Sequence, residues 1–151
     1  MKGNSLSSIT PYLTVQDGNS AVAFYQQAFN AQEVGPRLVS PDGKILHTEL
    51  AIDGAKFMLA DEFPEFKNEG PQAFGGTPVR LNLESDDVDA LAAQAIAAGA
   101  KVQIPVTDQF YGYRSGRLED PFGHIWILSQ KVEDVTNDEM QRRANEFFDK
   151  N

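Results

Sequence analysis

Cysteine is absent from this chain of 151 residues, and long apolar runs are absent as well. Without cysteine there is no disulfide framework, no thiolate metal site and no cysteine nucleophile. No apolar stretch approaches the length of a membrane span, and residues 1–8 are polar and lack the apolar core of a signal peptide. We therefore expect a cytoplasmic protein that has no membrane partner.

Basic residues are also scarce relative to acidic ones. The chain has 13 Lys and Arg against 22 Asp and Glu, which gives a formal net charge of −9, and no basic run is visible. A nucleic-acid partner is not expected, because binding to the phosphate backbone relies on clustered lysine and arginine. The chain also lacks a Ser-His-Asp pattern. It has no glycine-rich strand-to-helix turn for a nucleotide-like cofactor, and we predict no cofactor.

What the sequence does contain is an internal repeat. Residues 120–128 predict a tight turn, formed by Pro121 and Gly123, that leads into a strand of alternating faces. Residues 52–59 repeat this pattern in weaker form, with Gly54 in the place of Gly123. The two copies are separated by about half of the chain, which indicates two copies of one supersecondary unit.

The first half predicts one strand, one helix and then three strands. Residues 9–15 alternate as a strand, Asp17 offers N-cap chemistry, and Asn30 is a plausible left-handed stop for the amphipathic helix between them. The three strands that follow cover residues 31–40, 44–52 and 56–60. The last two are joined by the hairpin signal Asp53-Gly54.

The second half predicts the same order of elements. A strand over residues 79–84 precedes a helix that is capped by Asp86 and Asp87 and ended by Gly99. The further strands cover residues 101–106, 114–119 and 125–128. Beyond them, Thr136 and Glu139 form a capping box for a C-terminal helix.

These elements divide the chain into three parts. We expect a flexible N-terminus over residues 1–8, a single domain over residues 9–130, and a C-terminal extension with a helix over residues 131–151. Within the domain, module 1 covers residues 9–61, a linker covers residues 62–76, and module 2 covers residues 77–130.

Four stretches carry a resemblance to a known family. They are Pro11-Tyr12-Leu13-Thr14-Val15 before Phe24-Tyr25, Leu46-His47-Thr48-Glu49-Leu50, Asp108-Gln109-Phe110-Tyr111-Gly112, and Asp120-Pro121-Phe122-Gly123-His124. With the duplicated modules they resemble the vicinal oxygen chelate superfamily, which includes glyoxalase I, extradiol dioxygenases and bleomycin-resistance proteins. Together with residues 132–135 and 139–143, they look like its PhnB-like branch.

The resemblance implies an α+β fold in which two tandem βαβββ modules form a half-open curved mixed sheet with a site on its concave side. Superfamily members usually pair, and an apolar stripe on the C-terminal helix offers a surface for this, so we expect a homodimer. The stripe consists of Met140, Ala144, Phe147 and Phe148.

The resemblance also locates the family metal site. Family members hold the metal by side chains from the first and last strand of each module, and these places fall on Thr10, Met58, Arg80 and Ile127. A guanidinium cannot be deprotonated to coordinate, and Met58 and Ile127 do not suit the hard or borderline metals of this family. We therefore predict no metal, and neither glyoxalase nor dioxygenase activity of the metal-dependent kind.

Strand alternation sorts the side chains into two faces, and a slip of one residue would invert the assignment. The apolar residues on one face of the strands are expected to lie under the helices as core. They are Leu13, Val15, Leu46, Leu50, Phe57, Leu59, Leu81, Leu83, Trp126 and Leu128. The residues on the other face of the strands are expected to line the concave side. They are Tyr12, Thr14, His47, Glu49, Met58, Arg80, Asn82, Ile125 and Ile127.

His47 and Glu49 are two residues apart and thus share one face. They are candidates for a general acid/base pair or for polar ligand anchors, and a hydrogen-bonded pair that keeps a groove wet is the alternative. Arg80 is expected to pair with Glu49 or to bind an anionic ligand group. His124 is expected to be a locally bonded turn residue.

Phe110, Tyr111 and Tyr113 belong to a stretch over residues 108–113 that we call the aromatic loop, and they suit either a lid or pocket wall or a dimer contact. The ligand-binding residues that we predict are Tyr12, His47, Glu49, Met58, Arg80, Asn82, Phe110, Tyr111, Arg114 and Ile127.

These observations favour a metal-free, PhnB-like protein that binds a small organic molecule in the cleft between its two modules. The sequence leaves open whether the protein is an enzyme. One alternative is a metal-independent isomerase or lyase that uses His47 and Glu49 for proton transfer, and another is a drug-sequestering protein of the bleomycin-resistance type.

Overall fold

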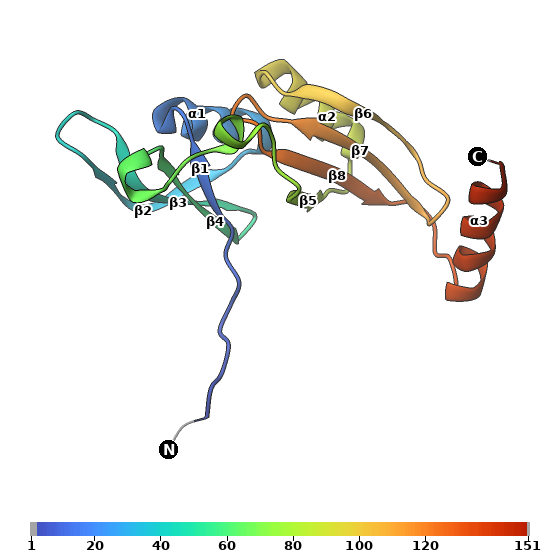
Figure 1. Cartoon of the computed structure of the whole chain (residues 1–151). Coiled ribbons are helices and arrows are strands. Elements are labelled where there is room, and N and C mark those ends of the chain that lie inside the picture. The colour runs from blue at the N-terminus through green and yellow to red at the C-terminus, as the bar shows by residue number, and fades with distance from the viewer. Residues whose placement is uncertain (1–2, 151) are drawn as a thin grey trace.

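The computed structural model describes residues 3–150 and has two modules that lie side by side (Figure 1). Module 1 contains β1 (Tyr12–Val15), α1 (Gly18–Phe29), β2 (Gln32–Val39), β3 (Ile45–Ile52) and β4 (Ala55–Asp61). Module 2 contains β5 (Arg80–Glu84), α2 (Val88–Ala98), β6 (Lys101–Asp108), β7 (Tyr113–Glu119) and β8 (Ile125–Lys131). The linker holds two short 3-10 turns, η1 (Pro64–Phe66) and η2 (Pro71–Phe74), and α3 (Asn137–Lys150) follows module 2.

The two modules have the same topology. Their strand orders are β1-β4-β3-β2 and β5-β8-β7-β6, with a parallel first pair and antiparallel pairs thereafter. The registers also correspond, because Tyr12 lies opposite Met58 as Asn82 lies opposite Ile127. The predicted α+β fold of two tandem βαβββ modules is therefore confirmed, with its strands divided between two four-stranded sheets.

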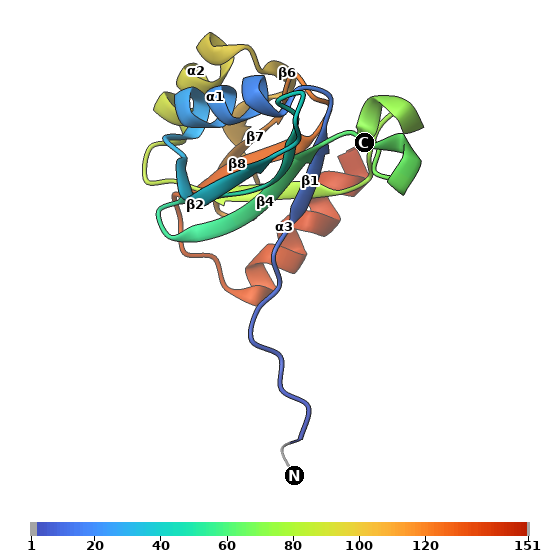
Figure 2. The same cartoon turned by 90° about the vertical axis from the view of Figure 1, so that its left-hand side faces the viewer.

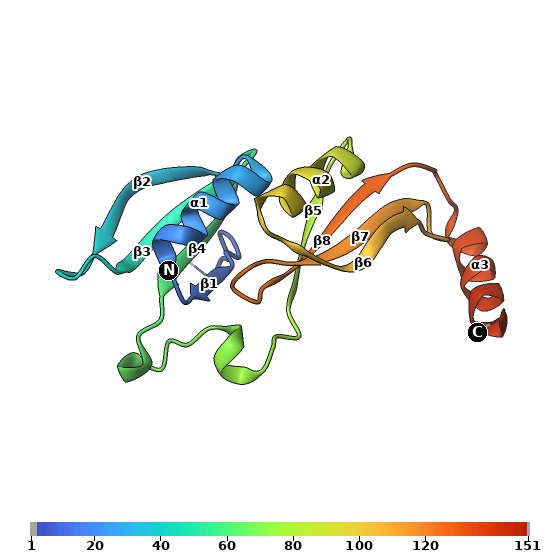
Figure 3. The same ribbon diagram turned by 90° about the horizontal axis from the view of Figure 1, so that it is seen from above.

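Helix α1 and helix α2 begin and end where the sequence predicts. The carboxylate of Asp17 accepts a hydrogen bond from the backbone N–H of Ser20 at 3.1 Å, and Asp87 does the same for Ala90 at 3.1 Å. Helix α1 ends at Asn30 with a left-handed φ of 56°. Both helices lie on the same side of the sheets (Figures 2 and 3).

One aromatic cluster joins the two modules beneath these helices. Trp126 of β8 lies 4.8 Å from Phe29 and 5.8 Å from Phe57 between ring centroids, and Tyr25 lies 5.3 Å from Phe57. All four side chains are buried. Aromatic pairs at these separations stabilise a core beyond their buried area, so the modules share one hydrophobic core. The predicted placement of Trp126 under the helices is confirmed.

Asp120 fixes the turn before β8. Its Oδ2 atom accepts hydrogen bonds from the Tyr25 hydroxyl at 2.5 Å and from Trp126 Nε1 at 2.9 Å. Its Oδ1 atom accepts from the backbone N–H groups of Phe122 at 2.9 Å and His124 at 3.0 Å. Burial and the Asp120 carboxylate raise the pKa of Tyr25 well above its usual value, because both oppose a phenolate there.

His124 is bonded less locally than predicted. Its backbone N–H belongs to the turn, but its ring atom Nε2 donates to the carbonyl oxygen of Thr14 in module 1 at 2.9 Å. The sequence around His124 does not indicate this contact, because Thr14 belongs to the other module. His124 therefore contributes to the junction between modules.

Most of the core positions are as predicted, but the assignment fails at the start of β3. Ile45 is fully buried, whereas Leu46 is 44% exposed, although Leu46 was expected in the core. The register between β2 and β3 shifts at this point, from Leu38 opposite His47 to Val39 opposite Ile45. Such a bulge inverts the face of the residues beyond it.

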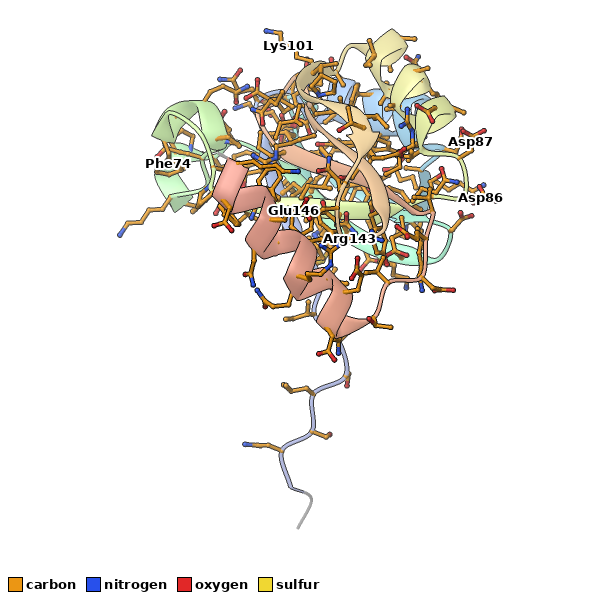
Figure 4. All side chains as sticks on the ribbon, turned by 90° about the vertical axis from the view of Figure 1, so that its right-hand side faces the viewer. Phe74, Asp86, Asp87, Lys101, Arg143 and Glu146 are labelled. Carbon is orange, nitrogen blue, oxygen red and sulfur yellow. The ribbon has the colours of Figure 1, made fainter. Side chains whose placement is uncertain are left out.

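The C-terminal extension is anchored at one end of module 2. Arg143 of α3 (labelled in Figure 4) pairs with Glu133 at 2.8 Å and donates to the carbonyl oxygen of Phe110 at 3.1 Å. Phe147 lies 5.4 Å from Phe110 between ring centroids, and Phe148 is exposed. The helix thus lies beside the aromatic loop, and its apolar stripe is only partly covered.

Residues 3–8 are exposed and have no regular secondary structure, whereas residues 1–2 and 151 lie outside the described residues. The flexibility expected for residues 1–8 stays a prediction. Within residues 3–150, no helix combines the length and apolar character that crossing a membrane requires.

Candidate functional site

The side of module 1 that faces away from α1 carries four of the predicted site residues. We call these residues the module 1 floor: Tyr12, His47, Glu49 and Met58. Met58 lies opposite both Tyr12 and Glu49 in the sheet, so the three side chains form a row across β1, β4 and β3. The predicted grouping of these residues on one face is therefore observed.

Tyr12 and His47 are in direct contact on this floor. A hydrogen bond of 2.7 Å joins the Tyr12 hydroxyl and His47 Nδ1, and the two rings meet edge to face at 5.4 Å between centroids. Desolvation by burial raises the pKa of Tyr12. A phenol that stays protonated can donate to a neutral imidazole, so the pair orients the His47 ring.

Glu49 does not complete an acid/base pair with His47. The Glu49 carboxylate makes no hydrogen bond or ion pair with any residue in the range 3–150, and this includes both His47 and Arg80. The expected Glu49–Arg80 ion pair is absent, because Glu49 lies on the sheet of module 1 and Arg80 on the sheet of module 2. Alternation along a strand predicts which face of its sheet a side chain occupies, but it does not predict which side chains of two different sheets come into contact.

The matching side of module 2 is hollowed. We call its residues the module 2 floor: Arg80, Asn82, Ser115, Arg117, Ile125 and Ile127. A cavity of about 400 Å³ lies toward the linker, and another of about 240 Å³ lies toward the aromatic loop. Arg80 and Arg117 line both cavities.

The aromatic loop borders the smaller cavity through Tyr111. The Tyr111 hydroxyl lies 3.4 Å from Ser115 Oγ, and the Phe110 ring packs edge to face on Tyr111 at 5.2 Å between centroids. Phe110 in turn contacts Phe147 of α3. Tyr111 therefore forms a pocket wall, and Phe110 connects that wall to the C-terminal extension.

Arg114 lies apart from the other predicted site residues. It forms a bidentate pair with Asp89 of α2 at 2.9 Å and a further contact with Asp108 at 3.2 Å. These hydrogen bonds raise its pKa, Asp89 having the larger effect. Since Asp89 belongs to the helix layer, Arg114 faces the opposite side of β7 from Arg117.

Arg117 is the residue that the sequence prediction missed. It lies opposite Ile127 on β8 and follows Ser115 by two positions, so strand alternation along residues 113–119 places both on the floor. The same alternation predicts that Arg114 faces the other way. The signal was therefore present in the sequence, in the alternation along β7.

A third cavity, of about 350 Å³, lies at the junction of the modules. Its walls are mainly apolar, and among the predicted site residues only Asn82 lines it. The other lining residues include Pro11, Ile52, Phe57, Leu81, Leu83 and Trp126. The predicted residues are thus divided between two floors and are not gathered in this junction cavity.

Three of the four positions that the resemblance assigns to the family metal carry side chains that do not suit a hard or borderline cation. Met58 and Ile127 occupy the last strands, and Arg80 brings a fixed positive charge to the first strand of module 2. Within residues 3–150, no group of three or more His, Cys, Asp or Glu side chains is arranged to hold an ion. The donor set that a hard or borderline cation needs is therefore missing at these positions.

The fold and the two floors define a class of protein built from paired βαβββ modules with concave sheet faces. The chain belongs to the Glyoxalase/Bleomycin resistance protein/Dioxygenase superfamily, whose family model matches residues 5–128. It is 44% identical over 137 residues to an uncharacterized protein of Mycobacterium tuberculosis strain H37Rv, covering 89% of this chain and 80% of that protein.

Two solved structures illustrate the likeness. The X-ray structure of the Arabidopsis thaliana At5g48480 gene product has a TM-score of 0.65 at 29% identity, covering 83% of this chain and 99% of that one. The PhnB protein from Bacillus cereus has a TM-score of 0.60 at 20% identity, covering 82% and 99%. The second likeness concerns the fold alone.

Proposed function

We propose that this chain is a metal-independent member of its superfamily that binds a small organic molecule on its concave floors. The observation that carries the proposal is the hollowed module 2 floor, where Ile104, Ile127 and Tyr111 surround a few converging polar groups. Apolar walls with a small number of polar anchors are typical of small-molecule sites. A cytoplasmic location belongs to the same proposal.

The proposal includes a homodimer. The apolar stripe of α3 is partly exposed in the single chain, and Phe148 at its end is 72% exposed. Exposed apolar surface of this kind is stabilised when a second surface covers it. A second copy is the occupant we propose, because an isologous contact needs only one self-complementary stripe.

Native mass spectrometry of the purified protein is expected to show a dimer that carries a co-purifying small molecule on each chain. Ile127→Trp should abolish the bound mass, because the larger side chain fills the module 2 floor. Leu6→Trp, at a fully exposed position, is the matched control and should retain it. A ligand that stays bound to a folded Ile127→Trp protein would contradict this location, and a monomer without ligand would contradict the proposal.

Metal analysis provides a separate prediction. The purified protein is expected to hold no stoichiometric zinc, nickel, iron or manganese, because Met58, Arg80 and Ile127 offer no suitable donors. Turnover of the glutathione–methylglyoxal adduct should stay undetectable after metal is added. Elemental analysis after dialysis checks the first point. One tightly held metal per chain, bound through His47 and Glu49, would show that the prediction is wrong.

The Tyr12–His47 hydrogen bond favours a second candidate function, an isomerase or lyase that transfers protons on the module 1 floor. The His47 imidazole and the unpaired Glu49 carboxylate lie on the same floor, and a bound substrate could use them separately as general acid and base. A bell-shaped pH–rate profile that disappears in Glu49→Gln would favour this enzyme. Stoichiometric binding without turnover would favour the binding protein, including one that sequesters drugs.

A further inference from the structure

Two arginines, Arg80 and Arg117, line the module 2 floor on either side of β8. Arg80 lies on β5 and Arg117 on β7, with Ile125 and Ile127 of β8 between them. Arg80 lies opposite Ile125 and Arg117 opposite Ile127, so the two are diagonal neighbours on strands about 10 Å apart, within reach of one ligand held between two long side chains. Both arginines line the same two cavities, so they share one groove.

Neither of these arginines is neutralised by the protein. The other four arginines of the chain, Arg37, Arg114, Arg142 and Arg143, are each paired with a carboxylate. Among residues 3–150, no carboxylate oxygen lies within 4.0 Å of a nitrogen of Arg80 or Arg117, although Glu119 lines the larger cavity. A chain with a net charge of −9 thus keeps two unpaired arginines together in one groove.

Arg117 also has a buried donor that finds no acceptor. Its Nε atom is shielded from solvent and makes no hydrogen bond within the part of the chain that the structure describes. Leaving a buried polar group without a partner is unfavourable, so native structures contain few such groups and each one calls for an explanation. Arg117 also lines both cavities, so an acceptor in the groove can reach its side chain.

The surroundings define what that acceptor would be attached to. Ser115 and Gln109 add polar groups beside Arg117, whereas Ile104, Ile127 and Tyr111 provide apolar walls. A planar guanidinium binds oxyanions through two parallel hydrogen bonds, which a neutral ligand cannot replace equally well.

We infer that Arg80 and Arg117 form an anion subsite on the module 2 floor, which takes an organic carboxylate or phosphonate carried on a compact apolar body. The inference rests on the proposed function, because it assigns a chemical class to the ligand of the same floor. The oxyanion lies between the two guanidiniums, and the apolar body packs on Ile127 and Tyr111.

The test compares charged and neutral probes of the same shape. Phenylacetate and phenylphosphonate are titrated against phenylacetamide, with calorimetry for affinity and NMR amide shifts for location. Phenylacetate is expected to bind at least about tenfold more tightly than phenylacetamide, as a charge-assisted hydrogen bond implies. The shifts should map to β5, β7 and β8.

Variants then assign the preference to the two arginines. Arg117→Gln and Arg80→Gln should each reduce the ratio of phenylacetate to phenylacetamide affinity to less than about threefold. Arg117→Lys keeps the charge but loses the planar group that can donate two parallel hydrogen bonds, so its ratio should be intermediate. Arg142→Gln on α3 removes the same charge from an exposed site and should keep the full preference. Thermal melts confirm that each variant is folded.

Two outcomes would overturn the inference, and they are distinguishable from each other. If the amide and the anions shift the same floor resonances with equal affinity, the anion subsite is wrong and the proposed binding function stands. If none of the three probes shifts the floor at millimolar concentration, the anion subsite and the proposed location of the ligand both fail.

Discussion

Replacing Asp120 by alanine is expected to lower the free energy of unfolding by about 4 kcal/mol, which for a domain of this size is a large part of the total. The substitution leaves the Tyr25 hydroxyl and Trp126 Nε1 buried without an acceptor. Each orphaned donor costs about 1–3 kcal/mol, and the turn also loses its two backbone contacts to Oδ1. Urea denaturation followed by Trp126 fluorescence measures the change.

Two comparisons separate the Asp120 network from general effects of mutation. Tyr25→Phe removes only one of the four hydrogen bonds and should cost about 1 kcal/mol. Asp149→Ala, at an exposed position near the end of α3, should change stability by less than about 0.5 kcal/mol. An Asp120→Ala protein as stable as Asp149→Ala would mean that the buried network contributes nothing to stability.

In module 1, Gly18→Ala is expected to cost roughly 3 kcal/mol. A Cβ atom at this position would lie 2.7 Å from Asp61 Oδ2 and 2.9 Å from Ile45 Cδ1. The buried Asp61 carboxylate accepts hydrogen bonds from the backbone N–H groups of Gly18 at 2.7 Å and Ile45 at 2.6 Å. The methyl group therefore overpacks the core, at a cost of about 1–3 kcal/mol, and displaces charge-assisted hydrogen bonds.

Ala23→Ser on the exposed face of the same helix is the matched control, with an expected change of less than about 0.5 kcal/mol. Both proteins can be compared by the midpoint of urea unfolding at constant slope. If Gly18→Ala unfolds at the same urea concentration as Ala23→Ser, Asp61 moves without cost and does not lock the start of α1 to β3. A loss similar to that of Asp120→Ala would show that both modules depend on a buried aspartate.

The repeat and its elements could be predicted because their causes are local. Asp17, Asn30 and Gly99 act within one turn of their own helices, and strand alternation records which side of a sheet faces the core. The prediction failed at Leu46, where a shift in pairing between β2 and β3 exchanged the faces. The extra residue of this bulge lies in β3, but where it falls depends on the pairing with β2, which the sequence of β3 alone does not specify.

The sequence by itself determined the two-module architecture and the four residues of the module 1 floor. These follow from periodicity and from the chemistry of single side chains. Only the tertiary structure decided which charges meet. It paired Arg114 with Asp89, kept Glu49 away from Arg80, and left Arg80 and Arg117 together without a carboxylate. Electrostatic interactions depend on distances of a few ångströms between separate strands and helices, and alternation along one strand carries no information about those distances.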